Sequence, residues 1–224
     1  MSKHLWRAID NLMPRLIALS ARVEESLRLA IEAVKQNDIV LAVQVVEMDH
    51  VIDREEIDIE EECLKILALH QPVAGDLRTI VAVLKINNDL ERIGDLSVDI
   101  AKHAIKIAQA GNGSFAFDFS ELFTRVRGML KNSLDALVRM DAAVADEVLT
   151  EDDRVDELNR EFCDQVLDAI RKEPDKAYTL IQFMNVSKRL ERIGDHATNM
   201  AEDVIYLVTG EIVRHGTGLE KKGE

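Results

Sequence analysis

The sequence predicts an all-α protein made of two tandem three-helix bundles. Its 224 residues include ten glycines, three prolines and only 4% aromatic residues, a composition typical of helical proteins. Apolar residues recur at intervals of three and four over long stretches, as on one face of a helix. The hexapeptide LERIGD occupies residues 90–95 and returns at 190–195. A repeat of about a hundred residues indicates an internal duplication with six long helices in all.

The first bundle is predicted from three consecutive amphipathic segments. Residues 4–35 form one long helix with Pro14 inside it as a candidate kink. Asn37 or Asp38 is a suitable N-cap for a second helix, whose apolar residues continue to Leu67. Pro72 suits the first turn of a third helix that contains the first LERIGD and ends near residue 108.

A glycine-rich and aromatic-rich segment, residues 109–122, is predicted to join the two bundles. Asp118 and Glu121 have the spacing of a capping box for a fourth helix over about 119–145. A fifth helix is expected over about 150–172, and Pro174 starts a sixth that contains the second LERIGD and ends near residue 208. We therefore expect bundles at 1–110 and 119–210 and a flexible tail at 211–224.

The composition excludes several classes of function. With 28 basic and 42 acidic residues the net charge is −14, and no basic stripe is present, so binding to nucleic acid is not expected. The N-terminus lacks the apolar segment of a signal peptide, and no stretch is long and apolar enough to span a bilayer. We expect a cytoplasmic protein without direct membrane insertion. Cys63 and Cys163 have no CxxC partner and are expected to be reduced and buried, and their separation of one hundred positions fits the duplication.

Carboxylates recur on the outer face of both LERIGD helices. On a helical wheel, Leu190 and Ile193 face the core, and Glu191, Asp195 and Asn199 lie near the opposite side. The third helix repeats this arrangement with Glu91, Asp95 and Asp99 at positions i, i+4 and i+8. Acids four apart repel each other by a few tenths of a kcal/mol, and a cation between them would reverse the sign.

The neighbouring helices contribute further acid pairs, Asp49 with Asp53 and Asp152 with Asp156. Hard oxygen ligands on adjacent helical turns suit Mg²⁺, Mn²⁺, Ca²⁺ or iron. A simpler reading is that the acids form surface ion pairs with Arg92 and Arg192, which precede Asp95 and Asp195 by three residues. The duplication of the whole pattern favours metal. The predicted metal ligands are Asp49, Asp53, Glu91, Asp95, Asp99, Asp152, Asp156, Glu191, Asp195 and Asn199.

Two glycines of the repeat and one histidine motif bear on the site. Gly94 and Gly194 each cost about 1 kcal/mol relative to Ala inside a helix, which suggests that they let an acid-bearing neighbour come close. Glu47-x-x-His50 has the spacing that ferritin-like di-iron bundles use twice, but the second half has no counterpart. A carboxylate-bridged di-iron enzyme and a metal-free helical scaffold therefore remain as alternatives to a metal-binding adaptor.

The segments ALHQPVAGDLR, NDLERIGD and RLERIGDHATNMAED resemble the signatures of the PhoU family, accessory regulators of bacterial high-affinity phosphate uptake. The resemblance covers the chain from the first helix to about residue 210. It implies two three-helix bundles with multinuclear metal sites on their outer faces. The E/D-x-x-x-D motifs that build these sites match Asp49 with Asp53, Glu91 with Asp95, Asp152 with Asp156 and Glu191 with Asp195. Iron, zinc, magnesium and manganese all remain candidates for the metal.

The resemblance also implies a role and partners that spacing and composition do not. A protein of this family is expected to be a non-enzymatic negative regulator and a homodimer. It would restrain the phosphate ABC transporter through the ATPase subunit, and it would hold the phosphate-sensing histidine kinase inactive when phosphate is plentiful.

Overall fold

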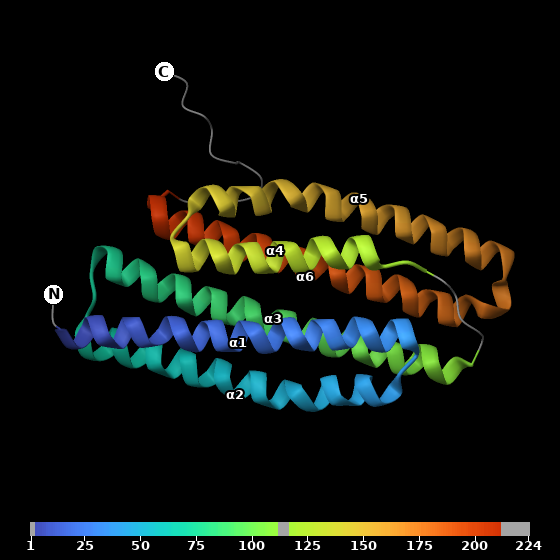
Figure 1. Cartoon of the computed structure of the whole chain (residues 1–224), viewed down its shortest axis with the longest axis horizontal. Coiled ribbons are helices and arrows are strands. Elements are labelled where there is room, and N and C mark those ends of the chain that lie inside the picture. The colour runs from blue at the N-terminus through green and yellow to red at the C-terminus, as the bar shows by residue number, and fades with distance from the viewer. Residues whose placement is uncertain (1–2, 112–116, 212–224) are drawn as a thin grey trace, which may run out of the picture.

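The computed structural model describes residues 3–111 and 117–211. The first half consists of α1 (Lys3–Gln36), α2 (Ile39–His70) and α3 (Ala74–Ala110). The second consists of α4 (Ser120–Arg139), α5 (Ala142–Lys172), a short 3₁₀ turn η1 (Pro174–Lys176) and α6 (Ala177–Thr209). Each half is an up-down-up bundle, and the two bundles lie side by side in an elongated molecule (Figure 1). The predicted all-α fold with two tandem bundles is confirmed.

The two LERIGD helices, α3 and α6, pack against each other along the middle of the molecule (Figure 1). We call this contact the seam. Among the described residues, three charged pairs cross it: Lys85 Nζ lies 2.6 Å from Asp203 Oδ1, His196 Nδ1 lies 2.8 Å from Asp89 Oδ1, and Arg189 Nε lies 3.2 Å from Asp99 Oδ2. A buried hydrogen bond also crosses it, with His103 Nδ1 2.8 Å from Gln182 Oε1. One hydrophobic core extends through both bundles. The two LERIGD helices are therefore held together along the faces that they turn toward each other.

Matching caps begin the second helix of each bundle. Asp38 caps α2, accepting hydrogen bonds from the amides of Val40 and Leu41, so the predicted N-cap is confirmed. Asp141 caps α5 in the same way. The prediction of one helix over 119–145 is therefore wrong. Met140 has a left-handed backbone with φ 54° and ψ 47°, which ends α4 at Arg139.

Two further details of the helix ends differ from the prediction. Pro72 lies before α3 instead of in its first turn, because Val73 is the N-cap. The residue before a proline is disfavoured in the right-handed helical region, and Gln71 accordingly has φ 45°. Asp118 accepts a hydrogen bond from the Ser120 amide, but the N-cap of α4 is Phe119, so no capping box forms between Asp118 and Glu121. The tail predicted at 211–224 lies outside the described residues apart from Glu211.

The cysteine prediction is half right. Both thiols are free; Cys63 is fully buried, which raises its pKa to about 11, but Cys163 is only half-buried. The hundred-residue separation is also not a structural match. Ile52 and Val155 are equivalent positions of the two bundles, because they contact Gly94 and Gly194 respectively. Cys63 lies eleven positions after Ile52, and the residue eleven positions after Val155 is the core residue Val166, not Cys163.

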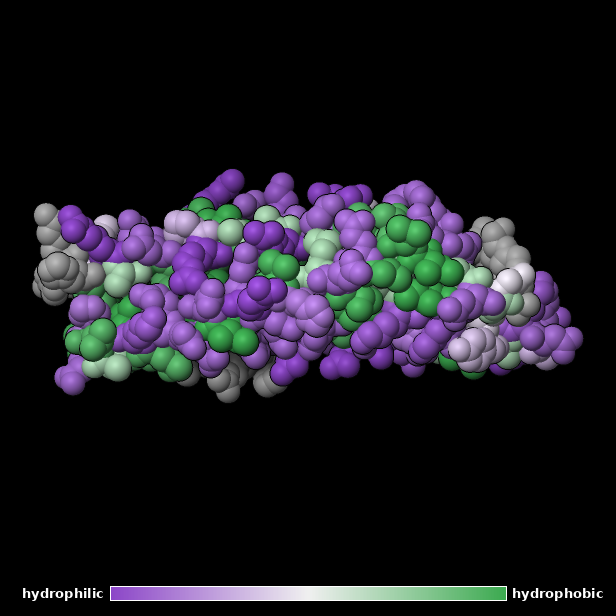
Figure 2. All heavy atoms as spheres, turned by 90° about the horizontal axis from the view of Figure 1, so that it is seen from below, coloured by the Kyte–Doolittle hydropathy of each residue, from purple (hydrophilic) through white to green (hydrophobic). Residues whose placement is uncertain are grey.

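The face shown in Figure 2 is mostly hydrophilic, with hydrophobic residues in separate groups, the largest of them right of the centre and others toward the left end. Exposed aliphatic side chains at the start of α2 are Ile39, Val40 and Val43. No helix within residues 3–111 and 117–211 has both the length and the hydrophobicity needed to cross a bilayer.

Candidate functional site

Gly94 and Gly194 place the acid-bearing helices of each bundle in close contact. A Cβ added to Gly94 would lie 3.2 Å from Ile52 Cγ2 of α2, and one added to Gly194 would lie 3.3 Å from Val155 Cγ1 of α5. Both distances are tighter than ordinary van der Waals contact. The glycines therefore act as predicted: they let α2 approach α3, and α5 approach α6, at the level of the carboxylates.

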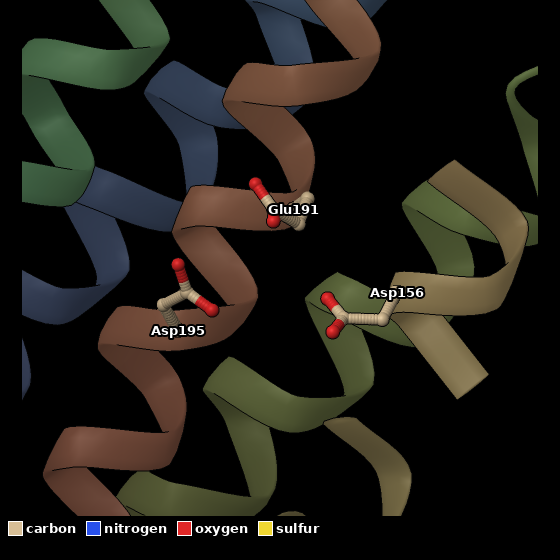
Figure 3. Close-up of side chains that lie close together, drawn as sticks. All are labelled: Asp156, Glu191 and Asp195. Atoms are coloured by element: carbon tan, nitrogen blue, oxygen red, sulfur yellow. The ribbon is translucent and has the colours of Figure 1, made fainter. Parts of the chain in front are cut away.

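In the second bundle, the predicted acids of α5 and α6 converge. Asp156 of α5 faces Glu191 and Asp195, which lie on successive turns of α6 (Figure 3). One carboxylate oxygen from each lies within 4.8 Å of the other two. Asp152 lies one turn before Asp156 and accepts a 3.1 Å hydrogen bond from the Thr198 hydroxyl. We call Asp152, Asp156, Glu191 and Asp195 the second acid cluster.

The second acid cluster carries an electrostatic penalty. Partial burial raises the pKa of Asp152, Glu191 and Asp195 above the usual carboxylate range, and neighbouring carboxylates add to the rise. No basic side chain among the described residues forms an ion pair with any of the four acids. A cation bound between them would remove the repulsion.

In the first bundle the corresponding acids lie between α2 and α3. We call Asp49, Asp53, Glu56, Glu91 and Asp95 the first acid cluster. Burial is the largest cause of the raised pKa of Asp49, Glu56 and Glu91, and nearby carboxylates raise each further. Glu56 was not among the predicted ligands. Its counterpart in the second bundle is Asn159, because the Asn87 amide donates to Glu56 as the Ser187 hydroxyl donates to Asn159.

The first acid cluster differs from the second in its compensation by arginine. Arg92 Nη1 donates a 3.2 Å hydrogen bond to Asp95, and Arg92 Nε lies 3.3 Å from Glu91 Oε2. Arg192 has the same position in its LERIGD but forms no ion pair with Glu191 or Asp195 in the part of the chain that the structure describes. The surface ion-pair reading thus describes the first half but not the second.

Two predicted ligands lie apart from the clusters. Asp99 pairs with Arg189 across the seam and with Lys102, at 3.2 and 3.6 Å. Asn199 is exposed and makes no hydrogen bond within the described residues. As metal ligands both remain predictions, as do the other eight, but the geometry gathers Asp156, Glu191 and Asp195 most closely.

The residues fit a hard cation. Asp49 Oδ1 is buried and has neither a hydrogen bond nor an ion pair among the described residues. Glu91 Oε2 is also buried and forms no hydrogen bond there, but Arg92 Nε lies 3.3 Å from it. Unpaired carboxylate oxygens are costly where water is excluded, and a bound cation would satisfy them. The donors are oxygens from two adjacent helices, the ligand type of Mg²⁺, Mn²⁺, Ca²⁺ and iron. Thr198 is the supporting residue that the sequence pattern did not single out, whereas Glu56 was expected on the same side of its helix as Asp49 and Asp53 without being predicted as a ligand.

Comparison with known proteins shows what this arrangement is similar to. The PhoU domain family model matches residues 16–104 and again 119–204. The chain is 36% identical to the phosphate-specific transport system accessory protein PhoU homolog of Pseudomonas putida, over 96% of this chain and 84% of that protein. It is 34% identical to the Aquifex aeolicus homolog of the same name, over 98% of this chain and 99% of that protein.

Solved structures agree with this likeness. The crystal structure of PhoU from Pseudomonas aeruginosa superposes with a TM-score of 0.88 at 35% identity, covering 92% of this chain and 99% of that one. That of the phosphate transport system regulatory protein PhoU from Streptococcus pneumoniae has a TM-score of 0.86 at 25% identity, covering 94% of this chain and all of the other.

Proposed function

The chain belongs to the PhoU family, and from that premise we propose that it is a metal-binding regulator of phosphate transport. The relatives are named as accessory or regulatory proteins of phosphate transport systems. In more detail, we propose a negative regulator of phosphate uptake and of the phosphate-starvation response. It would act by contact with the ATPase subunit of the phosphate ABC transporter and with the phosphate-sensing histidine kinase.

The observation that supports metal binding best is the second acid cluster. Three carboxylates from two helices converge within 4.8 Å, and no arginine or lysine among the described residues pairs with them. Charged groups gathered in this way are normally compensated, because like charges at short range are destabilising. A cation at this place would lower the free energy of the folded state and join α5 to α6 on the surface of the bundle.

The same geometry favours an adaptor over a carboxylate-bridged di-iron enzyme. In di-iron bundles the ligands project into the interior from four helices, including two Glu-x-x-His motifs. Here the clusters lie between two helices on the outer face, and Glu47 and His50 are both exposed. We therefore assign no catalytic residue. Oxygen consumption by iron-loaded protein would revive the enzyme reading.

Metal analysis of purified protein tests the proposal. We expect bound metal in the wild type and a lower content in Asp95→Ala/Asp195→Ala, with helicity by circular dichroism nearly unchanged. The matched control is Asp58→Ala, because Asp58 is an exposed α2 acid whose one ion pair among the described residues is a 3.8 Å contact with Arg15. Unchanged metal in the double variant would refute the site, and metal-free wild type would favour the scaffold reading.

The proposed oligomeric state and the proposed protein partners need separate binding experiments. We propose a cytoplasmic homodimer, which light scattering of the purified chain will check. Pull-down with the transporter ATPase and with the cytoplasmic part of the kinase is expected to succeed for metal-loaded protein. Failure of both would contradict the adaptor role even if metal were bound.

A further inference from the structure

The seam contains a cavity of about 300 Å³ beside the first acid cluster. Four side chains that can carry positive charge line it: Arg92 and Lys102 of α3 and Arg192 and His196 of α6. Small-molecule sites in proteins occupy about 300 to 1,000 Å³, so this cavity suits a ligand of the smallest class. It lies at the point where the two bundles meet.

Arg192 is the basic residue in this cavity that forms no ion pair or hydrogen bond with the described residues, although its charge acts to lower the pKa of Glu191 and Asp195. Arg92 pairs with Asp95, Lys102 lies 3.6 Å from Asp99, and His196 lies 2.8 Å from Asp89. Arg192 has no ion pair or hydrogen bond to any residue that the structure describes. Its guanidinium, a planar fork of five donors, is therefore available to a ligand.

We propose that the seam cavity binds a small protonated oxyanion, of the class of hydrogen phosphate, through the guanidinium of Arg192. This inference rests on the proposed function, because it takes the cation of the first acid cluster as the counter-charge. A guanidinium holds a tetrahedral oxyanion through two parallel charge-assisted hydrogen bonds, which lysine cannot do.

The acidic part of the lining selects for a protonated anion. Asp49, Asp95 and Asp99 also line the cavity, and ionised carboxylates can only accept hydrogen bonds. A hydrogen phosphate ion has an O–H group to donate to such an oxygen. Sulfate is unprotonated near neutral pH, so it has no O–H group to donate and its oxygens would be repelled by these carboxylates. Phosphate is therefore preferred to sulfate.

Metal and oxyanion are coupled through shared residues. Asp49 and Asp95 belong both to the first acid cluster and to the cavity lining. A cation held by these carboxylates would neutralise charge that otherwise repels the anion. By thermodynamic linkage, phosphate must then raise the affinity for metal by the same factor by which metal raises the affinity for phosphate.

Equilibrium dialysis with radiolabelled inorganic phosphate tests the inference. The dialysis is done on Mn²⁺-loaded and on chelator-treated protein, with metal content measured in every sample. We expect saturable binding in the loaded protein and weaker binding after chelation. Arg192→Gln should bind phosphate about tenfold or more weakly while retaining its metal, because a bidentate charge-assisted contact is lost. Arg171→Gln is the control, since Arg171 is exposed at the end of α5 and pairs with Asp168.

The outcomes separate this inference from the proposed function. Absence of metal from the wild type would refute the proposed function and the coupled site with it. Metal without phosphate binding, or Arg192→Gln binding like the wild type, would overturn the inference alone. Phosphate binding that ignores chelation would overturn the coupling, and equal competition by sulfate would overturn the selection for a protonated anion.

Discussion

The Thr198 hydroxyl donates a 3.1 Å hydrogen bond to Asp152 Oδ1, whereas Asp49, the corresponding acid of the first bundle, has a buried Oδ1 with no hydrogen-bond partner in the described part of the chain. The residue in the place of Thr198 in the first LERIGD helix is Val98, four positions after Gly94, and a valine cannot donate. The two clusters thus have the same frame but different hydrogen bonding. Without metal, the first cluster has the poorer hydrogen bonding, although Arg92 compensates part of its charge.

Thr198→Val should remove the hydrogen bond to Asp152, and Val98→Thr should supply one to Asp49. Thr198→Val should lower the free energy of unfolding of the metal-free protein by about 1–3 kcal/mol, because it leaves the half-buried Asp152 without its hydrogen bond. Val98→Thr should stabilise the metal-free protein, since the new hydroxyl can reach Asp49. Urea denaturation with and without a chelator measures both. Equal stability of Thr198→Val and wild type in the chelator would contradict the assigned role of this hydrogen bond.

The raised pKa values of the carboxylate clusters should appear in the pH dependence of the free energy of unfolding. Burial raises the pKa of Asp152 and Glu191, so the folded chain holds their protons more tightly than the unfolded chain does. Their contribution to stability is present below the ordinary carboxylate pKa and is lost as the pH rises through the raised values.

We therefore expect Asp152→Asn/Glu191→Gln to become progressively more stable than metal-free wild type between about pH 4 and about pH 7. Thermal unfolding of both proteins across this range measures the difference. Asp164→Asn, which removes an exposed α5 carboxylate, is the control and should give a flat difference. Saturating metal should remove the effect, because metal binding requires the ionised carboxylates. A difference independent of pH would count against the electrostatic penalty.

Most of the fold could be predicted from helical periodicity. The core stripes of α1, α3 and α6 could be predicted because a helix returns to the same face every 3.6 residues, whatever its neighbours. The break between α4 and α5 was missed because neither glycine nor proline marks it. Met140 takes the left-handed conformation and Asp141 caps the next helix, and neither residue type requires that arrangement.

The acid faces could be predicted for the same reason, but their compensation could not. Arg92 and Arg192 have identical spacing to the acids of their own helices. Both arginines line the seam cavity, but Arg92 pairs with Asp95, whereas Arg192 forms no ion pair among the described residues. The difference arises from how α3 and α6 pack across the seam, which no local pattern contains.

The ion pair between Lys85 and Asp203 should stabilise the seam. Asp203 is only 14% exposed, and its burial raises its pKa even with Lys85 Nζ at 2.6 Å. Lys85→Met should destabilise the protein by about 1–2 kcal/mol, since it leaves a mostly buried carboxylate unpaired. The control is Lys65→Met, which breaks a surface pair with Glu62 and should cost about 0–1 kcal/mol. If urea denaturation gives the same loss of unfolding free energy for both variants, the pair between Lys85 and Asp203 contributes no more than a surface ion pair.

The spacing between α5 and α6 should determine metal affinity in the second bundle. Gly194→Ala adds a methyl group 3.3 Å from Val155 Cγ1, so α5 must move outward by a few tenths of an ångström or Val155 must repack. Asp156 is one residue from Val155 and would move away from Glu191 and Asp195. We expect weaker metal binding in titration calorimetry, even though alanine favours the helix by about 1 kcal/mol.

Shortening the opposing side chain provides the internal control. Val155→Ala removes the methyl group that Gly194→Ala meets, so the double variant should recover metal affinity that Gly194→Ala loses. Such non-additivity is expected only for residues in direct contact. Gly128→Ala on α4 is the matched substitution, because an added Cβ there meets nothing within 4 Å, and it should leave metal binding unchanged. If Gly194→Ala binds metal like Gly128→Ala, the close approach of α5 and α6 does not set the geometry of the second acid cluster.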